Sequence, residues 1–359
     1  MHRAHNFSAG PAALPLEVLQ KVQSELVDYK GAGSSIMEMS HRGAEYTEVD
    51  RQARERLTRL LGLGDDFEIL FLQGGASTQF MTVPFNFLGE GKTADYLTTG
   101  SWSQKALKEA KLLGNPREAF SSKDVNFNRV PEDQELNLSK DAEYVHFTSN
   151  NTIFGTEFHK EPETGDIPLV CDASSNILSK PLNIKKYGLI YAGAQKNAGP
   201  SGLTIVLIRK DFLQKAKKEG IPSMISYHTH VGTLFNTPPS FAVYFFNEVL
   251  AWVEKMGGLE GMAKLNQEKA SLLYDEIDKD DFYTGTAETK SRSLMNVTFR
   301  LPTEELEKEF LAEAKANNMT GLKGHRSVGG LRASIYNACP KESVQALVEL
   351  MQDFRSKKG

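Results

Sequence analysis

The chain has few of the features that mark secreted, membrane-spanning or nucleic-acid-binding proteins. Its 359 residues include only two cysteines, Cys171 and Cys339, which are isolated and form neither a disulfide framework nor a zinc-binding spacing, so we expect no metal site. No apolar run approaches the length of a membrane span, and the N-terminal MHRAHNFSAGP lacks the apolar region of a secretory signal. The formal net charge of −4 gives no basic excess for nucleic acid or anionic membranes. These absences favour a protein of the reducing cytoplasm, without nucleic-acid or membrane partners.

The composition and the order of the apolar segments predict an α/β protein in two parts. Apolar residues make up 40% of the chain and charged residues 25%, as in ordinary globular domains. Up to about residue 215, short apolar strands alternate with helical segments, which indicates a mostly parallel sheet with helices on both faces. Long helices and a smaller α+β unit are expected to follow. We predict an N-terminal segment over 1–15, a large domain over 16–256 and a small C-terminal domain over 257–359.

The segment YAGAQKNAGP, residues 191–200, places Lys196 in a turn of small residues between two apolar segments. Both flanks, 189–192 and 203–208, are short and bounded by glycine or proline, which predicts buried strands. A lysine in such a turn loses hydration, which lowers its pKa and favours the neutral amine that attacks carbonyl groups. Most lysines are solvated surface residues, so a plain turn residue is the alternative.

Asp172 ends another apolar run and lies 24 residues before Lys196. The carboxyl end of a buried strand is where open α/β sheets bind ligands. Pyridoxal phosphate chemistry needs this pair, because a lysine forms the Schiff base and a carboxylate keeps the pyridine nitrogen protonated. The alternative is that Asp172 only caps the start of a helix.

A predicted strand over 68–72 runs directly into QGGAST, residues 73–78. A glycine turn that opens a helix presents free backbone N–H groups and the positive end of the helix dipole, and both favour a phosphate. The turn lacks the P-loop lysine and the dinucleotide fingerprint, so a phosphate here belongs to something smaller than a nucleoside triphosphate. Tight packing is the alternative role of the glycines. Trp102 follows another strand and could stack on a flat heterocycle, although core packing is commoner for a lone tryptophan.

Five longer motifs give the chain a specific resemblance. They are NFSAGPAALP from residue 6, MEMSHRG around Arg42, YAGAQKNAGP around Lys196, FNTPPSF around Asn236 and KGHRSVGGLRASIYNA from residue 323. In this order they resemble the phosphoserine aminotransferases over essentially the whole chain. The resemblance implies the aspartate aminotransferase fold (fold type I), pyridoxal 5′-phosphate as cofactor, and a homodimer with shared active sites. It also implies amino transfer from L-glutamate to 3-phosphohydroxypyruvate and, as in many bacteria, action on a phosphorylated intermediate of pyridoxine synthesis.

The resemblance assigns a cofactor role to a set of matching positions. Lys196 would form the Schiff base, Asp172 would face the pyridine nitrogen and Trp102 would stack on the ring. Asn236 and Thr237 would reach the cofactor phosphate from the neighbouring subunit. The full set comprises Ala76, Ser77, Trp102, Thr152, Asp172, Gln195, Lys196, Asn236 and Thr237.

The resemblance also assigns five cations to substrate binding. Arg332 would bind the α-carboxylate, and a phosphate pocket that also accepts the glutamate side chain would comprise His41, Arg42, His325 and Arg326. Arginine suits this role because its planar guanidinium makes two-pronged contacts with carboxylate or phosphate. Some relatives carry arginine at the position of Ser77 and serine at that of Ala9, so these two departures bear on affinity and substrate preference.

Three other functions are alternatives to this one. A cysteine desulfurase of the same fold needs a reactive cysteine on a mobile loop, whereas Cys171 is expected inside a buried strand and Cys339 just before a proline. A transaminase for alanine or glyoxylate would not need His325 and Arg326 beside Arg42. A non-catalytic phosphate-binding protein would have no use for a paired lysine and aspartate.

Overall fold

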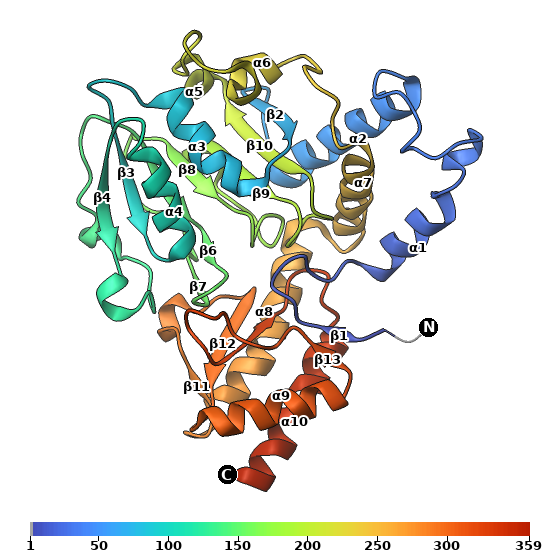
Figure 1. The fold of residues 1–359 in the computed structure, drawn as a ribbon, viewed down its shortest axis with the longest axis vertical. Coiled ribbons are helices and arrows are strands. Elements are labelled where there is room, and N and C mark those ends of the chain that lie inside the picture. The colour runs from blue at the N-terminus through green and yellow to red at the C-terminus, as the bar shows by residue number, and fades with distance from the viewer. Residues whose placement is uncertain (1–2) are drawn as a thin grey trace.

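The computed structural model describes residues 3–359, and Figure 1 shows how their helices and strands are arranged. The strands are β1 His5–Asn6, β2 Phe67–Leu72, β3 Thr93–Thr98, β4 Asn115–Ser121, β5 Ala142–Thr148, β6 Asn150–Asn151, β7 Thr156–Glu157, β8 Leu169–Asp172, β9 Tyr187–Gly193, β10 Thr204–Arg209, β11 Thr284–Gly285, β12 Asn296–Arg300, β13 Met319–Thr320 and β14 Leu331–Ser334. The α-helices are α1 Leu16–Glu25, α2 Ala44–Leu61, α3 Gly75–Phe87, α4 Ser101–Ala110, α5 Lys210–Gln214, α6 Tyr227–His230, α7 Ser240–Lys255, α8 Gly258–Ile277, α9 Glu304–Ala316 and α10 Lys341–Lys358. Short 3-10 helices are η1 Tyr29–Gly31, η2 Lys123–Val125, η3 Asp133–Glu135, η4 Ile184–Lys186, η5 Ser223–Ile225 and η6 Thr289–Ser291.

The large sheet has seven strands in the order β2-β10-β9-β8-β5-β3-β4. Strands β9, β8, β5, β3 and β4 pair in parallel, whereas β10 is antiparallel to both β9 and β2. The predicted mostly parallel sheet is therefore confirmed. Strand β10 reverses direction because a short turn, instead of a crossover helix, joins it to β9. Lys196 lies in that turn.

Helices cover both faces of the large sheet (Figure 1), because successive side chains of a strand point to opposite sides. In β9, Leu189 and Tyr191 pack in one cluster with α3, α4 and α5, and Ile190 and Ala192 pack in another with α2 and α7. All four side chains are fully buried. A strand covered on both sides needs apolar residues at every position, which explains the unbroken apolar run in the sequence.

The carboxyl ends of the central strands meet at one edge of the sheet. Thr148 at the end of β5 is in register with Asp172 at the end of β8, and Asp172 is in register with Tyr191 of β9. The chain after β9 then turns through Lys196 at the same edge. The topology thus brings Asp172 and Lys196 together, as expected from the place of each in the sequence.

The C-terminal part forms a smaller α+β unit around the three-stranded sheet β11-β12-β14. Its core contains Leu273 of α8, Phe299 of β12, Phe310 of α9 and Phe354 of α10. Phe7 joins this core because β1 pairs in parallel with β13. Helix α8 contributes its first turns to the large core and its later turns to the small one. The domain boundaries proposed from the sequence stay a prediction. Residues 1 and 2 of the predicted N-terminal segment lie outside the described residues.

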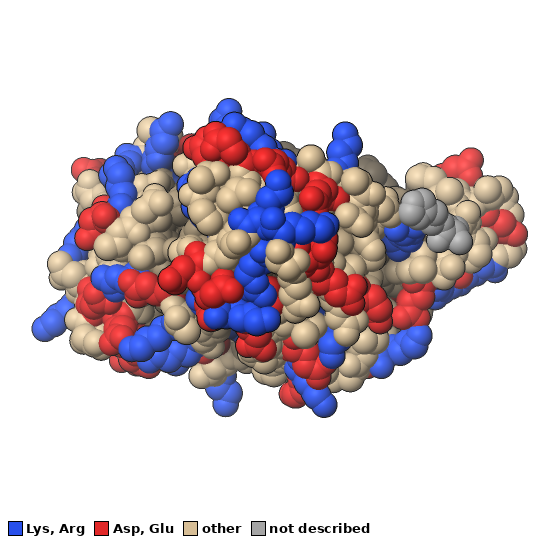
Figure 2. All heavy atoms as spheres, turned by 90° about the horizontal axis from the view of Figure 1, so that it is seen from below, with Lys and Arg blue, Asp and Glu red and all other residues tan. Residues whose placement is uncertain are grey.

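Figure 2 shows the molecule from the side of the C-terminal unit, where basic and acidic side chains alternate over the surface. Ion pairs account for part of this alternation, such as Lys358 with Glu309 at 2.7 Å. Within residues 3–359, no helix is long and apolar enough to cross a membrane.

Candidate active site

A cavity of about 390 Å³ opens at the carboxyl edge of the large sheet, facing the C-terminal unit. Nine of the fourteen residues proposed from the sequence line it together. They are Ala76, Ser77, Trp102, Thr152, Asp172, Gln195, Lys196, His325 and Arg332.

Lys196 lies in the turn between β9 and β10, where its ammonium group meets one hydroxyl. Its Nζ donates a hydrogen bond to Thr152 Oγ1 at 2.5 Å. Burial lowers the pKa of Lys196 to about 8, an effect that the charge of Asp172 opposes and that of Arg332 reinforces. The amine is therefore far more available as a base near neutral pH than an ordinary lysine.

Asp172 is buried at the end of β8, and its carboxylate is held by the next turn of chain. Its Oδ1 accepts hydrogen bonds from the backbone N–H of Ser174 at 3.0 Å and from the Ser174 hydroxyl at 2.6 Å. Burial raises the pKa of Asp172, while the bonds from Ser174 and the charge of Lys196 lower it. A carboxylate in this position favours a cationic partner in the cavity.

The predicted anion-binding turn is present where β2 runs into α3. Gly74 has a φ of +91°, and a Cβ there would lie 2.0 Å from Thr78 Oγ1, so the close turn requires glycine. Helix α3 begins at Gly75, and Ala76 and Ser77 form its first turn on the cavity wall. Their backbone N–H groups and the helix dipole make this wall a favourable place for a phosphate.

Trp102 stands in the first turn of α4 and faces the cavity as well as the core. The centre of its ring lies 5.5 Å from Lys196 Nζ, and the side chain packs against the apolar cluster around Phe154. Its buried Nε1 has no hydrogen-bond partner within the described chain. The side chain thus offers an aromatic face and a free donor to a bound molecule.

The C-terminal unit contributes Arg332 and His325 to the cavity wall. Arg332 Nη1 donates to the carbonyl oxygen of Thr152 at 3.2 Å, and its buried Nε has no partner within residues 3–359. Burial lowers the pKa of Arg332. The pKa of His325 is lowered by burial and then by the charges of Arg332, Arg326 and Lys105. A ligand carboxylate would satisfy the guanidinium that the protein leaves partly unpaired.

The remaining five proposed residues, His41, Arg42, Asn236, Thr237 and Arg326, do not line this cavity in a single chain. Four of them gather elsewhere at the surface. Asn236 Nδ2 donates to Gln73 Oε1 at 2.9 Å, and Arg42 Nη2 lies 3.5 Å from the carbonyl oxygen of Leu234. The loop that carries Arg42 therefore lies beside the segment that carries Asn236 and Thr237.

Reasoning from sequence missed three residues that shape the site. Ser174 holds the Asp172 carboxylate, and the serine two residues after an aspartate was the available signal. Asn150 lines the cavity and donates hydrogen bonds to Ser175 Oγ and Asn296 Oδ1, both at 2.8 Å. Gly10 lies against Lys196, since a Cβ at Gly10 would be 3.2 Å from Lys196 Cγ. No local pattern indicates the last two contacts, because they join distant parts of the chain.

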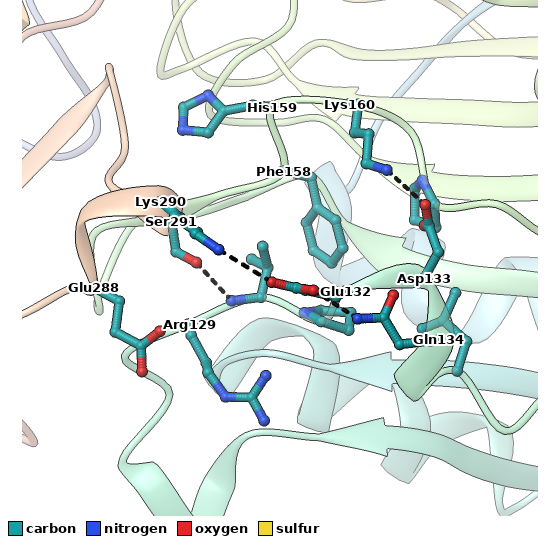
Figure 3. A pocket seen from close by; sticks show the side chains of 14 residues that line it. Arg129, Glu132, Asp133, Gln134, Phe158, His159, Lys160, Glu288, Lys290 and Ser291 are labelled. Carbon is teal, nitrogen blue, oxygen red and sulfur yellow. Dashed lines mark hydrogen bonds and ion pairs between the residues drawn. The ribbon is translucent and has the colours of Figure 1, made fainter.

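A second cavity, of about 420 Å³, lies where the loop after β4 meets the segment after β11 (Figure 3). Its lysines are paired within the chain, Lys160 with Asp133 at 2.6 Å and Lys290 with Glu132 at 3.4 Å. Arg129 is likewise held by a carboxylate. Because these charges neutralise one another, this cavity lacks the free cations and buried acid of the first, which is the better candidate for chemistry.

Comparison with known proteins agrees with this assignment. The family model described as aminotransferase class-V matches residues 4–347. The phosphoserine aminotransferase of Niallia circulans is 55% identical over 360 residues, covering 99% of both chains. The structure of phosphoserine aminotransferase from Bacillus circulans subsp. alkalophilus, 55% identical, superposes with a TM-score of 0.97 over 99% of both chains.

A more distant solved structure has pyridoxal phosphate bound. The phosphoserine aminotransferase from Trichomonas vaginalis with bound pyridoxal phosphate is 42% identical, with a TM-score of 0.93 over 98% of this chain and 100% of that one. The matched lengths leave no substantial part of the chain outside the comparison. The chain therefore belongs to the class-V aminotransferases and, among them, to the phosphoserine aminotransferase family.

Proposed function

We propose that the chain transfers the amino group of L-glutamate to 3-phosphohydroxypyruvate, giving O-phospho-L-serine and 2-oxoglutarate, with pyridoxal 5′-phosphate as cofactor. Membership of the phosphoserine aminotransferase family supports this reaction. One observation carries it: a lysine of lowered pKa, a buried aspartate and a partly unpaired arginine line the same cavity.

The residues of the cavity fit pyridoxal phosphate. The buried carboxylate of Asp172 faces the cavity, where a protonated pyridine nitrogen would add to the weak influence of the Lys196 charge, and Trp102 offers its ring to a flat heterocycle. The first turn of α3, with Ala76 and Ser77, would hold the phosphate together with Gln195. When bound, the cofactor supplies an electron sink for the negative charge that forms at the amino acid α-carbon.

The chain's own residues would then bind the substrate and move protons. Arg332 holds the α-carboxylate through its free N–H groups and so fixes the α-carbon near Lys196. Lys196 Nζ removes the α-proton of the amino donor and, in the second half of the reaction, delivers a proton to the α-carbon of the acceptor. Thr152 holds this Nζ in position through its hydroxyl.

Recognition of the second anionic group requires further cations, which we assign to His325, Arg326, His41 and Arg42. His325 already lines the cavity, whereas His41 and Arg42 lie outside it in a single chain. Arg42 lies beside the segment with Asn236 and Thr237. One neighbouring subunit would therefore supply this segment together with the His41–Arg42 loop. The proposal therefore includes a homodimer in which each active site is completed by the second copy.

The same pocket would accept the phosphorylated four-carbon keto acid whose amination gives 4-phosphohydroxy-L-threonine in pyridoxine synthesis. A desulfurase activity is disfavoured because Cys171 and Cys339 are both buried, and burial raises the pKa of Cys339 to about 11. We assign this biosynthetic reaction to the reducing cytoplasm, in keeping with Cys171 and Cys339 being free thiols.

The decisive test compares two acceptors with the cofactor-loaded enzyme and glutamate. A kcat/KM for 3-phosphohydroxypyruvate at least roughly a hundredfold above that for hydroxypyruvate would support the proposal, since a site built around a charged group discriminates strongly against its absence. Equal kcat/KM values for the two acceptors, or transfer only to glyoxylate or pyruvate, would contradict the proposed substrate but leave the cofactor assignment in place.

A further inference from the structure

Helix α4 carries, beside Trp102, a lysine that none of the sequence motifs indicates. Lys105 is exposed, and its Nζ lies 4.3 Å from the centre of the Trp102 ring. Trp102 in turn lines the active-site cavity and packs against the apolar cluster around Phe154, as does Val328 in the loop that carries His325 and Arg326. The ammonium group of Lys105 is therefore separated from the cavity by a single aromatic side chain.

Lys105 has no counter-charge in the described chain, although its own helix offers a carboxylate nearby. Glu109 lies four residues further along α4, at the spacing of a helical ion pair, yet Lys105 forms no ion pair with any carboxylate in residues 3–359. Its side chain instead extends one turn back, toward the N-terminal end of α4 and the cavity. A cation without a counter-charge at the edge of a site is available to an anionic ligand.

The charge of Lys105 acts on His325, one of the residues proposed to bind substrate. Together with Arg332 and Arg326, it lowers the pKa of His325, so these four groups share one electrostatic environment. In a single chain, Arg332 and Lys196 are the cations that line the cavity, because the lowered pKa of His325 favours its neutral form. A substrate with a carboxylate and a phosphate brings more negative charge than these two cations balance.

We propose that Lys105 is a specificity-determining residue, whose ammonium group attracts the second anionic group of the substrate at the edge of the cavity beside Trp102. It acts through space on the phosphate of the acceptor and is not a catalytic residue. This inference rests on the proposed function, because it refines which groups of the same site select phosphorylated substrates. The attraction between the Lys105 ammonium group and the substrate phosphate is screened by salt over the Debye length, about 8 Å at physiological ionic strength.

The test uses the cofactor-loaded dimer and three variants of helix α4. Lys105→Gln removes the charge, Lys105→Arg keeps it, and Lys108→Gln removes an equally exposed charge one turn further along, where no contact with Trp102 exists. For Lys105→Gln we expect kcat/KM with 3-phosphohydroxypyruvate to fall roughly three- to tenfold, with hydroxypyruvate changing less than about twofold. Lys105→Arg and Lys108→Gln should both stay near the parent value with either acceptor.

Two further measurements separate an electrostatic role from support of Trp102. Raising the KCl concentration should lower kcat/KM for the phosphorylated acid less steeply in Lys105→Gln than in the parent enzyme. The dissociation constant of inorganic phosphate, followed by tryptophan fluorescence, should rise in Lys105→Gln by a similar factor. An equal loss with both acceptors, an unchanged salt dependence or an unchanged phosphate affinity would overturn the inference. Failure of the parent enzyme to use the phosphorylated acid would overturn the proposed function instead, and the phosphate titration would still test Lys105.

Discussion

The ammonium group of Lys196 and the hydroxyl of Thr152 lie 2.5 Å apart, and the same threonine accepts a bond from Arg332 through its backbone carbonyl. One residue after β6 thus sets the position of both the proton-transferring amine and the carboxylate-binding guanidinium. This arrangement fixes the distance between the two groups without a direct contact of like charges.

Replacing Thr152 by valine should lower kcat roughly tenfold and leave KM for glutamate within about twofold, because the hydroxyl orients the amine while the backbone carbonyl that meets Arg332 remains. Steady-state kinetics with glutamate measure both constants. Thr152→Ser retains the hydroxyl and should recover most of the rate. A large rise in KM with unchanged kcat would instead assign Thr152 to substrate binding.

The lowered pKa of Lys196 predicts how the protein takes up its cofactor as pH changes. The reactive form is the neutral amine, so the rate of pyridoxal phosphate uptake by cofactor-free protein should rise with pH and level off above about pH 8. An ordinary lysine would keep gaining rate to about pH 10.5, and at pH 7 it would offer roughly 300-fold less neutral amine. Absorbance spectroscopy in a pH series measures the rate. Lys196→Ala should attach no cofactor covalently at any pH, while its circular dichroism spectrum remains that of the parent.

Asp172→Asn should retain the fold and lose most of the activity, because the amide keeps the shape of the side chain and removes its charge. We expect kcat to fall roughly a thousandfold, since preorganised charges opposite a reacting group are among the largest contributions to catalysis. The thermal midpoint should change little or increase, because burial already penalises the ionised form. Transamination assays and thermal denaturation measure the two effects, and Ser174→Ala, which removes one hydrogen bond to the carboxylate, should cost much less activity.

Features set by local sequence were predictable, and features set by topology were not. The turn around Lys196, the strand that ends at Asp172 and the glycine turn before α3 each follow from a short pattern of apolar, small and polar residues. The start of α9 is equally local, because the side chain of Thr303 accepts a hydrogen bond from the N–H of Leu306.

The convergence of distant segments had no local signal. His325 and Arg332 reach the cavity because the C-terminal unit packs against the edge of the large sheet, more than a hundred residues after Lys196. Only the family resemblance indicated this pairing from the sequence. Lys105 was missed altogether, because its position depends on the rotamer that it adopts over Trp102.

Lys269 connects the two parts of the molecule and gives the last prediction. It is fully buried in α8, and its ammonium group donates to backbone carbonyl oxygens of the chain after β14. The acceptors are Ile335 at 2.9 Å, Tyr336 at 2.6 Å, Asn337 at 3.4 Å and Cys339 at 3.3 Å. The N–H of Asn337 in turn donates to Asn197 Oδ1 at 2.9 Å, and Asn197 is the neighbour of Lys196 in the chain.

Lys269→Met should therefore affect both stability and catalysis. The substitution keeps an apolar stem of similar length and leaves several buried carbonyl oxygens without a donor, which should cost about 3 kcal/mol of stability and lower the thermal midpoint by roughly 3–5 °C. Lys264→Met, an exposed lysine on the same helix, should change the midpoint by no more than about 1 °C. Below its midpoint, the Lys269→Met enzyme should also show a lowered kcat, because the chain after β14 no longer holds Asn197 firmly beside the reactive lysine. Normal kcat together with lowered stability would show that Lys269 joins the two parts of the fold without positioning Lys196.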